Sequence, residues 1–258
     1  MGGQEEVRSR LEAGVLTVTI DRGAKRNAMT AAMYAELSAQ LDRAADDPEV
    51  RAFVLRSAAP GIFVAGTDIS HFAGFTGADG VDYEAMISGC VRRLETLRVP
   101  TVAVVEGVCL GGGLVLASVC DLRIATPAAR FGVPVARTLG NCLSADSLSV
   151  LTHRLGSSVT LDLLLRARTL DAEEAHRLGF VAEVAAEDAV EETLGEVLQT
   201  LRAHAPLTMW ATKELVARLR RAAVPQDADV LRAVYGSADF GTAVEAFASR
   251  TPVTWTGR

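Results

Sequence analysis

The stretch from Thr101 to Val119 constrains the fold more than any other part of the chain. Residues 101–105 read TVAVV, an apolar, β-branched run typical of a strand that is buried on both faces. Three glycines follow at 111–113, and residues 114–119 read LVLASV, a helical segment that is apolar nearly all round. A helix of this kind must lie in the middle of the molecule. The stretch therefore predicts a strand, a glycine turn and a helix at the centre of the core.

Short strands alternate with helices through the first half of the chain, which predicts the α/β class with right-handed crossovers. Thr30 is expected to cap a helix whose apolar face carries Met33, Leu37 and Leu41. After about Leu143 the pattern becomes mainly helical. The expected strands are 15–20, 52–55, 62–65, 101–105 and 122–125, and the further expected helices are 81–97, 171–179, 206–219 and 227–250.

Composition narrows the classes of function. The 258 residues are 49% hydrophobic and 22% charged, which predicts a well-filled core. A net charge of -6 argues against a nucleic-acid surface, although one or two local cations can still bind a phosphorylated small molecule. The segment from Met1 to Glu12 is polar, and no apolar run approaches the ~20 residues of a membrane span. We expect a cytoplasmic protein that binds neither nucleic acid nor membrane.

The cysteines give no sign of a metal site. Cys90, Cys109, Cys120 and Cys142 lack CxxC or Cys/His ligand spacing, so three of them are expected to be buried apolar residues. Cys142 as a nucleophile is disfavoured because no thiolate-stabilising partner is visible in the sequence.

Two glycine-centred turns are the candidate site. Residues 63–69 read FVAGTDI, and residues 111–113 are the three glycines; each turn passes from a strand towards a helix. Such passages leave the backbone N–H groups of Thr67 and Gly112 without intrahelical partners. Two N–H groups that converge on one oxygen form an oxyanion hole, which contributes ~3 kcal/mol or more per donor in acyl chemistry.

Other interpretations of the glycine run are weaker. A dinucleotide-binding GxGxxG is not completed because Leu116 takes its last position, and no Gly-Lys-Ser/Thr follows as in a Walker loop. A plain packing turn is the remaining alternative. A hydrolase of the Ser-His-Asp kind is disfavoured because no GxSxG is present.

The ordered set of motifs resembles the crotonase (enoyl-CoA hydratase/isomerase) family over nearly the whole chain. Both lysines, Lys25 and Lys213, fall where that family commonly has lysine. The matching stretches are Ile20-Asp21-Arg22, 25–29 (KRNAM), 63–69, 105–107 (VEG) with 111–113, 120–125 (CDLRIA), 131–134 (FGVP), Ala205-Pro206, and 255–258 (WTGR).

The resemblance implies a spiral of ββα units over residues 1–200 and a helical C-terminal oligomerisation region over 201–258. It implies a homotrimer or a dimer of trimers, with an acyl-CoA as substrate and no further cofactor. The thioester oxygen would accept from the N–H groups of Thr67 and Gly112. Residues expected along the CoA and acyl path are Lys25, Arg26, Ala28, Ala65, Asp68, Ile69, Ser70, Val115, Val135 and Asn141.

This chain departs from the family pattern where hydratases carry two glutamates. Val115 and Val135 stand at those positions, and if a one-residue insertion follows Pro134, Ala136 replaces Val135 in register. Hydration needs a general base and a general acid, each worth ~10²–10⁴-fold, and valine provides neither. The resemblance therefore implies enolate chemistry with a displaced base rather than ordinary hydration.

Asp146 is the first candidate for that base, because some relatives place a catalytic aspartate near this position. The alternative is that Asp146 caps a helix that starts near Ser147. Asn141 is a candidate lining residue, whereas His71 is expected to be inert, and Tyr83 and Glu84 are expected to face solvent.

Three hypotheses follow. The first is an acyl-CoA enzyme that stabilises a thioester enolate. The second is a catalytically degenerate, acyl-CoA-binding homo-oligomer. The third is a scaffold with a vestigial site, which the retained Gly66, Gly112 and Lys25 disfavour.

Overall fold

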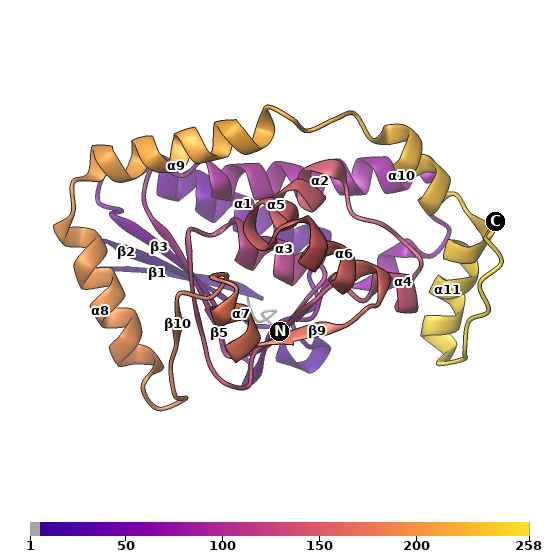
Figure 1. Cartoon of the computed structure of the whole chain (residues 1–258), viewed down its shortest axis with the longest axis horizontal. Helices are drawn as coiled ribbons and strands as arrows, with labels where there is room; N and C mark the ends of the chain where they lie inside the picture. The colour runs from indigo at the N-terminus through magenta and orange to yellow at the C-terminus, as the bar shows by residue number, and fades with distance from the viewer. Residues whose placement is uncertain (1–5, 258) are drawn as a thin grey trace, which may run out of the picture.

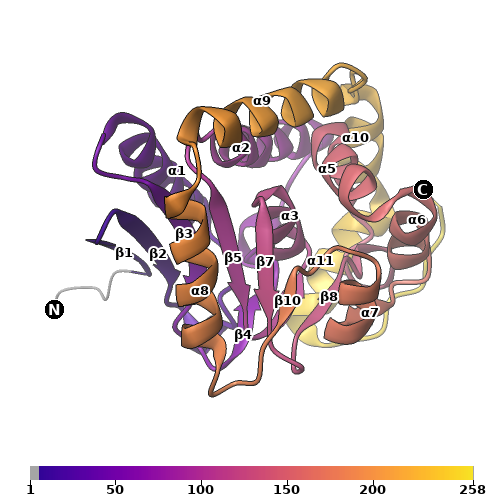
Figure 2. The ribbon, with the colours of Figure 1, turned by 60° about the vertical axis from the view of Figure 1, so that its left-hand side comes forward.

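The computed structural model of the chain describes residues 6–257. A first sheet has six strands in the order β1-β2-β3-β5-β7-β10 and is parallel except for the antiparallel β1–β2 pair (Figure 2). Its strands are β1 (Val7–Glu12), β2 (Val15–Ile20), β3 (Ala52–Ser57), β5 (Thr101–Val105), β7 (Leu122–Ala125) and β10 (Glu183–Val184).

A second sheet has four strands in the order β4-β6-β8-β9. They are β4 (Gly61–Val64), β6 (Gly107–Leu110), β8 (Arg130–Gly132) and β9 (Thr169–Asp171). The chain repeatedly places one strand in each sheet and then a helix, as in β3-β4-α2 and β5-β6-α3. The predicted α/β class and the spiral of ββα units are confirmed.

The helices cover the first sheet on both faces and extend along one edge of the molecule. In Figures 1 and 2, α8 lies on one face of this sheet, α9 runs along the outside of α2, and α11 lies at the far end from α8. The helices are α1 (Ala31–Asp46), α2 (Gly77–Glu95), α3 (Gly112–Val119), α4 (Val135–Thr138), α5 (Ala145–Leu155), α6 (Ser157–Leu165), α7 (Ala172–Arg177), α8 (Val190–Ala203), α9 (Pro206–Arg221), α10 (Ala228–Tyr235) and α11 (Ala238–Ser249), with 3₁₀ turns η1 (Gly23–Lys25) and η2 (Ile69–Phe72).

Strand β5 separates two hydrophobic clusters, as its largely apolar sequence predicts. Ala103 and Val105 belong to the main core, whereas Val102 and Val104 belong to a second cluster that α8 covers with Val190 and Leu194. Side chains alternate between the faces of a strand, so a strand that is covered on both faces is a nearly continuous apolar run. Every residue of β5 is buried.

Local signals place most of the elements. The side chain of Thr30 accepts from the N–H of Met33 and caps α1 as predicted. Helix α2 begins at Gly77 instead of Val81, because Thr76 and Asp79 form a capping box there. Strand β1 was not predicted, because it lies at the edge of the sheet and alternates charged with apolar residues.

The C-terminal helices are attached to the core by specific contacts. Lys213 of α9 donates to the carbonyl of Val99 at 2.6 Å and pairs with the carboxylate of Asp121. Helix α10 approaches α2 so closely that a β-carbon on Gly80 would lie 2.2 Å from the ring of Tyr235. No helix within residues 6–257 is long and apolar enough to cross a bilayer.

Candidate active site

The two glycine turns lie against each other. Gly66 follows β4 with φ +114°, and Gly111 follows β6 with φ +55°, so both take backbone conformations that favour glycine. A β-carbon on Gly111 would lie 3.5 Å from the α-carbon of Gly66. The strands β4 and β6 are parallel neighbours, which brings the ends of both to the same point.

The backbone N–H groups of Thr67 and Gly112 are both free. Residue 67 pairs with Met29 as a parallel bridge, in which Met29 donates to the carbonyl of Gly66 and Asp68 donates to the carbonyl of Met29, each at 2.9 Å. The N–H of Thr67 is therefore directed away from Met29. Gly112 is the first residue of α3, so its N–H has no intrahelical partner. Neither N–H donates to another group within residues 6–257.

Both residues line one cavity of about 410 Å³. Two tyrosines stand beside them: the hydroxyls of Tyr83 and Thr67 are hydrogen-bonded, and Tyr34 reaches the turn from α1. Burial raises the pKa of Tyr34 and of Tyr83 well above that of an ordinary tyrosine. These phenols are consequently neutral and can donate hydrogen bonds, but they are poor bases.

The two valines expected at the family's acid positions are apolar and lie in the cavity. Val115 of α3 and Val135, the first residue of α4, both line it. Ala136 is exposed and does not line it. Other apolar lining residues are Phe72, Ile87, Leu110, Leu139 and Leu143. Apolar side chains thus form much of the cavity wall.

Glu84 is the residue that sequence reasoning missed. It was expected to face solvent, but it is 4% exposed and lines the cavity, as Tyr83 also does. One Glu84 oxygen accepts from the hydroxyl of Tyr235 and the other from the N–H of Ser144, each at 2.8 Å. Burial is the main cause that raises the pKa of Glu84. A signal existed: Glu84 falls at the heptad spacing of Ile87, Val91 and Leu94, the buried face of α2.

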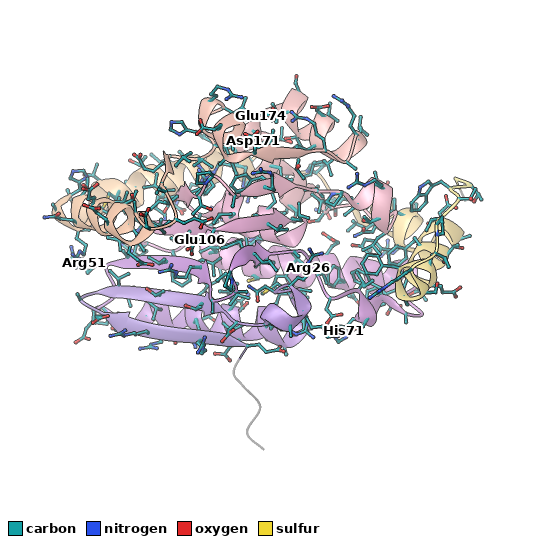
Figure 3. All side chains as sticks on the ribbon, turned by 90° about the horizontal axis from the view of Figure 1, so that it is seen from below. Arg26, Arg51, His71, Glu106, Asp171 and Glu174 are labelled. Carbon is teal, nitrogen blue, oxygen red and sulfur yellow. The ribbon has the colours of Figure 1, made fainter. Side chains whose placement is uncertain are left out.

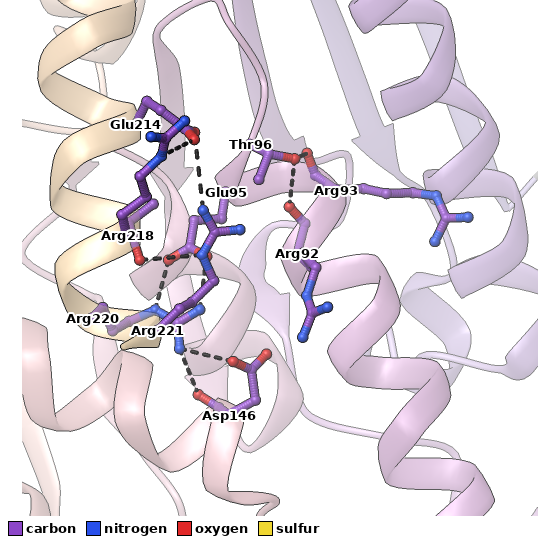
Figure 4. A network of polar contacts seen from close by, with 10 residues as sticks. Arg92, Arg93, Glu95, Thr96, Asp146, Glu214, Arg218, Arg220 and Arg221 are labelled. Atoms are coloured by element: carbon purple, nitrogen blue, oxygen red, sulfur yellow. Dashed lines mark hydrogen bonds and ion pairs between the residues drawn. The ribbon is translucent and has the colours of Figure 1, made fainter. Parts of the chain in front are cut away.

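Asp146 lies outside the cavity, which argues against its expected role as the base. Its Oδ1 accepts from Arg220 at 2.8 Å, and that guanidinium also binds Glu95 through two nitrogens (Figure 4). Asp146 is not the helix cap either, because the side chain of Ser144 accepts from the N–H of Ser147 and α5 begins at Ala145. Asp146 holds α5 against α9.

Most of the residues expected along the CoA path line one of two neighbouring hollows. Arg26, Ala65 and Ile69 line the cavity, and so does Asn141. Asp68, Ile69 and Ser70 line a neighbouring hollow of about 730 Å³ between η2 and α11. Lys25 is exposed, and Lys25 and Ala28 line neither hollow.

Asp68 and its neighbours fix the turn at the cavity mouth. The Asp68 carboxylate pairs with Arg22 at 2.7 Å and accepts from the hydroxyl of Ser70 at 2.7 Å. Burial acts to raise the pKa of Asp68, but the bonds from Ser70 and Arg22 outweigh it and lower the pKa to about 2.

His71 is exposed on η2 and lines neither hollow. Figure 3 shows it with Arg26 on the half of the molecule that carries α11, away from Arg51.

The cysteines are not arranged for chemistry. Burial raises the pKa of Cys142 to about 12, and the charge of Glu84 contributes in the same direction. Cys90, Cys109 and Cys120 are buried. No group of three or more His, Cys, Asp or Glu within residues 6–257 is placed to hold a metal ion.

Comparison with known proteins agrees with this architecture. The model of the enoyl-CoA hydratase/isomerase family matches residues 10–258. The mitochondrial methylglutaconyl-CoA hydratase of Mus musculus is 32% identical over 171 residues, which are 66% of this chain and 54% of that protein. The chain thus spans about half the length of that relative. A short-chain-enoyl-CoA hydratase of Clostridium acetobutylicum is 32% identical over 207 residues, covering 80% of this chain and 79% of its own.

A solved structure extends the likeness to the whole fold. Methylmalonyl-CoA decarboxylase in complex with 2-nitronate-propionyl-CoA superimposes with a TM-score of 0.90 over 99% of this chain and 100% of that one. The two sequences are 24% identical, so this likeness concerns the fold alone.

Proposed function

Because the chain belongs to the enoyl-CoA hydratase/isomerase (crotonase) family, we propose that it binds an acyl-CoA and stabilises its thioester enolate. The thioester oxygen accepts from the backbone N–H groups of Thr67 and Gly112. The observation that carries the proposal is that both N–H groups are free of partners within the described chain and belong to residues that line one cavity.

The physical basis is the charge that develops on that oxygen. When a proton leaves the α-carbon, the C–H electron pair forms the Cα=C bond and the carbonyl π pair moves to the thioester oxygen. Donors already fixed by two glycine turns stabilise this charge without reorganisation, which is worth ~3 kcal/mol per donor. A simple packing turn does not require two free N–H groups to face one cavity.

The reaction is enolate chemistry with weak hydration. Val115 and Val135 supply neither the base nor the acid that addition of water requires. The alternative is a catalytically degenerate protein that binds acyl-CoA without turnover, and the same two valines favour it. The two functions differ in whether the α-proton of a bound thioester exchanges.

Binding of the CoA part rests on local cations at the cavity mouth. Arg26 lines the cavity, and Lys25 is exposed next to it on η1. Cations of this kind attract phosphates, and their attraction at exposed sites weakens with salt. The acyl-CoA itself brings the CoA group, so no separate cofactor is proposed.

The C-terminal region, residues 201–258, is proposed to form a homotrimer or a dimer of trimers. Three leucines of α9, Leu207, Leu215 and Leu219, are 58–74% exposed. Exposed apolar side chains on one long helix are typical of a surface that another subunit covers.

Exchange of the α-proton of butyryl-CoA in D₂O tests the enolate function, with deuterium uptake measured by mass spectrometry. The decisive comparison is Gly112→Pro with Gly112→Ala, both in a Tyr34→Phe background that relieves the contact between residue 112 and the Tyr34 hydroxyl. Proline is tolerated at the first position of a helix, where it removes the N–H and puts its ring Cδ in that place.

We expect exchange ~10²-fold or more slower with proline than with alanine, the usual effect of losing one oxyanion donor. Equal rates in the two variants would refute the assignment of Gly112. Calorimetric binding of butyryl-CoA without exchange by the unmodified protein would select the binding protein instead.

A further inference from the structure

We propose that Glu84 is the carboxyl group that transfers the proton to and from the α-carbon of the bound acyl group. This inference rests on the proposed function, because it concerns the same cavity and the same enolate. It gives the chain the base that Val115 and Val135 cannot provide.

Position is the first argument. Among the residues that line the cavity, Glu84 is the only aspartate or glutamate, and it lies there with Thr67 and Gly112. A general base must be able to reach the proton that it removes, and Asp146 does not line the cavity.

The absence of a counter-ion is the second argument. Buried carboxylates are ordinarily paired with a cation, as Glu95 and Asp146 are with Arg220. Glu84 is as buried as Asp146, yet within residues 6–257 it forms no ion pair. A structural carboxylate at this depth would be expected to have a cation. A group that must gain and lose a proton is better served by two neutral donors.

The neutral donors hold both oxygens in place. Tyr235 donates to Oε1 and Ser144 N–H donates to Oε2, from positions 151 and 60 residues away in the sequence. The amide of Asn141 donates to the Tyr235 hydroxyl at 3.2 Å. Tyr235 is thus a positioning residue for Glu84, and Asn141 positions Tyr235 in turn.

The surrounding charges favour easy protonation of Glu84. The charge of Asp227, which precedes α10, adds to the effect of burial in raising the pKa of Glu84. The other titratable groups near it are Cys142 and Tyr34, from other parts of the chain, and Tyr83, the preceding residue of α2. A second hollow lined by Glu84 is also lined by two arginines and two aspartates, Arg92, Arg221, Asp146 and Asp227. Within residues 6–257 neither arginine forms an ion pair with Glu84.

The proton transfer is balanced without any further reactant. The Cα–H bond breaks, its electron pair forms the Cα=C bond of the enolate, and the Glu84 carboxylate takes the proton. The negative charge on the thioester oxygen is held by the N–H groups of Thr67 and Gly112. The reverse step returns a proton, or a deuteron in D₂O, to the α-carbon.

The test compares Glu84→Gln with Asp146→Asn in the butyryl-CoA exchange assay. Glutamine keeps the shape of Glu84 but cannot take the proton, so we expect exchange to fall ~10²–10⁴-fold, with the Kd for butyryl-CoA changed less than about threefold. Asp146→Asn removes a comparably buried carboxylate outside the cavity and should leave the exchange rate within about twofold.

Tyr235→Phe provides a readout that a merely structural Glu84 would not give. The exchange rate should rise with pH as Glu84 loses its proton. The Tyr235 hydrogen bond lowers the pKa of Glu84, so in Tyr235→Phe this rise should occur at a higher pH. The ring contacts of Tyr235 with Phe72 and Phe240 are kept in this variant.

Two outcomes would overturn the proposal: exchange at the unmodified rate in folded Glu84→Gln, or an unshifted pH profile in Tyr235→Phe. If Glu84→Gln does not fold, the Tyr235→Phe profile decides alone. Absence of exchange in the unmodified protein would instead refute the enolate function itself.

Discussion

The hydroxyl oxygen of Tyr34 lies 2.6 Å from the point that a β-carbon on Gly112 would occupy. Tyr34 comes from α1 and is 1% exposed, so its ring cannot move aside without displacing the core. Position 112 is therefore constrained in space by Tyr34, and the proposed oxyanion hole requires in addition that the residue there has an N–H group. The two requirements can be separated by mutation.

Gly112→Ala should lower the free energy of unfolding by about 1–3 kcal/mol, the usual cost of overpacking a core. Adding Tyr34→Phe removes the clashing oxygen and should recover most of the loss, because the two effects share one contact. Urea unfolding followed by circular dichroism measures both variants. Full stability of Gly112→Ala alone would contradict the packing described here.

Crotonyl-CoA should be hydrated at least ~10²-fold more slowly than by the Clostridium acetobutylicum relative under the same conditions, since Val115 and Val135 offer no acid or base. The loss of the conjugated thioester absorbance measures the rate. Exchange of butyryl-CoA in the same preparation is the control for an intact site. A hydration rate equal to that of the relative would show that another pair of groups activates water.

Arg220 joins α9 to α2 and α5 through Glu95 and Asp146 (Figure 4). Arg220→Met leaves the buried Asp146 without its cation and leaves Glu95 with only Arg221, 3.8 Å away, so it should cost about 3–5 kcal/mol of unfolding free energy. Arg218→Met removes an exposed pair with Glu214 on the same helix and should cost about 0.5 kcal/mol or less. Equal losses in urea unfolding would argue against a structural role for this network.

Asp68 should make stability depend on pH in the acid range. Its folded pKa of about 2 lies below the value of ~3.9 of an unfolded aspartate, so its contribution is complete above pH ~4 and is lost as the pH falls towards 2. Asp68→Asn should therefore show a shallower loss of stability between pH 4 and 2. Asp42→Asn, which removes a carboxylate from a surface pair with Arg93, is the matched control. The prediction fails if both variants follow the unmodified protein.

Local sequence was sufficient for elements whose signals lie within a few residues. The alternation of Val15–Ile20, the Thr30 cap and the apolar run of β5 each appear in the structure as predicted. Strand β1 was missed because its pairing with β2, rather than its own apolar content, makes it a strand. The glycine turns were also found, since a strand that ends at a glycine before a helix is a local pattern.

The sequence by itself determined the two turns at Gly66 and Gly112, the valines at 115 and 135, and the family. Only the tertiary structure decided which acidic residue lines the cavity. Asp146 looked suitable in the sequence, but Arg220, from a helix 74 residues later, binds it outside the cavity. Glu84 looked exposed, but Ser144 and Tyr235 fold over it and supply its donors. The burial and pairing of a carboxylate depend on residues distant in the chain, and these two quantities decide whether it can exchange a proton.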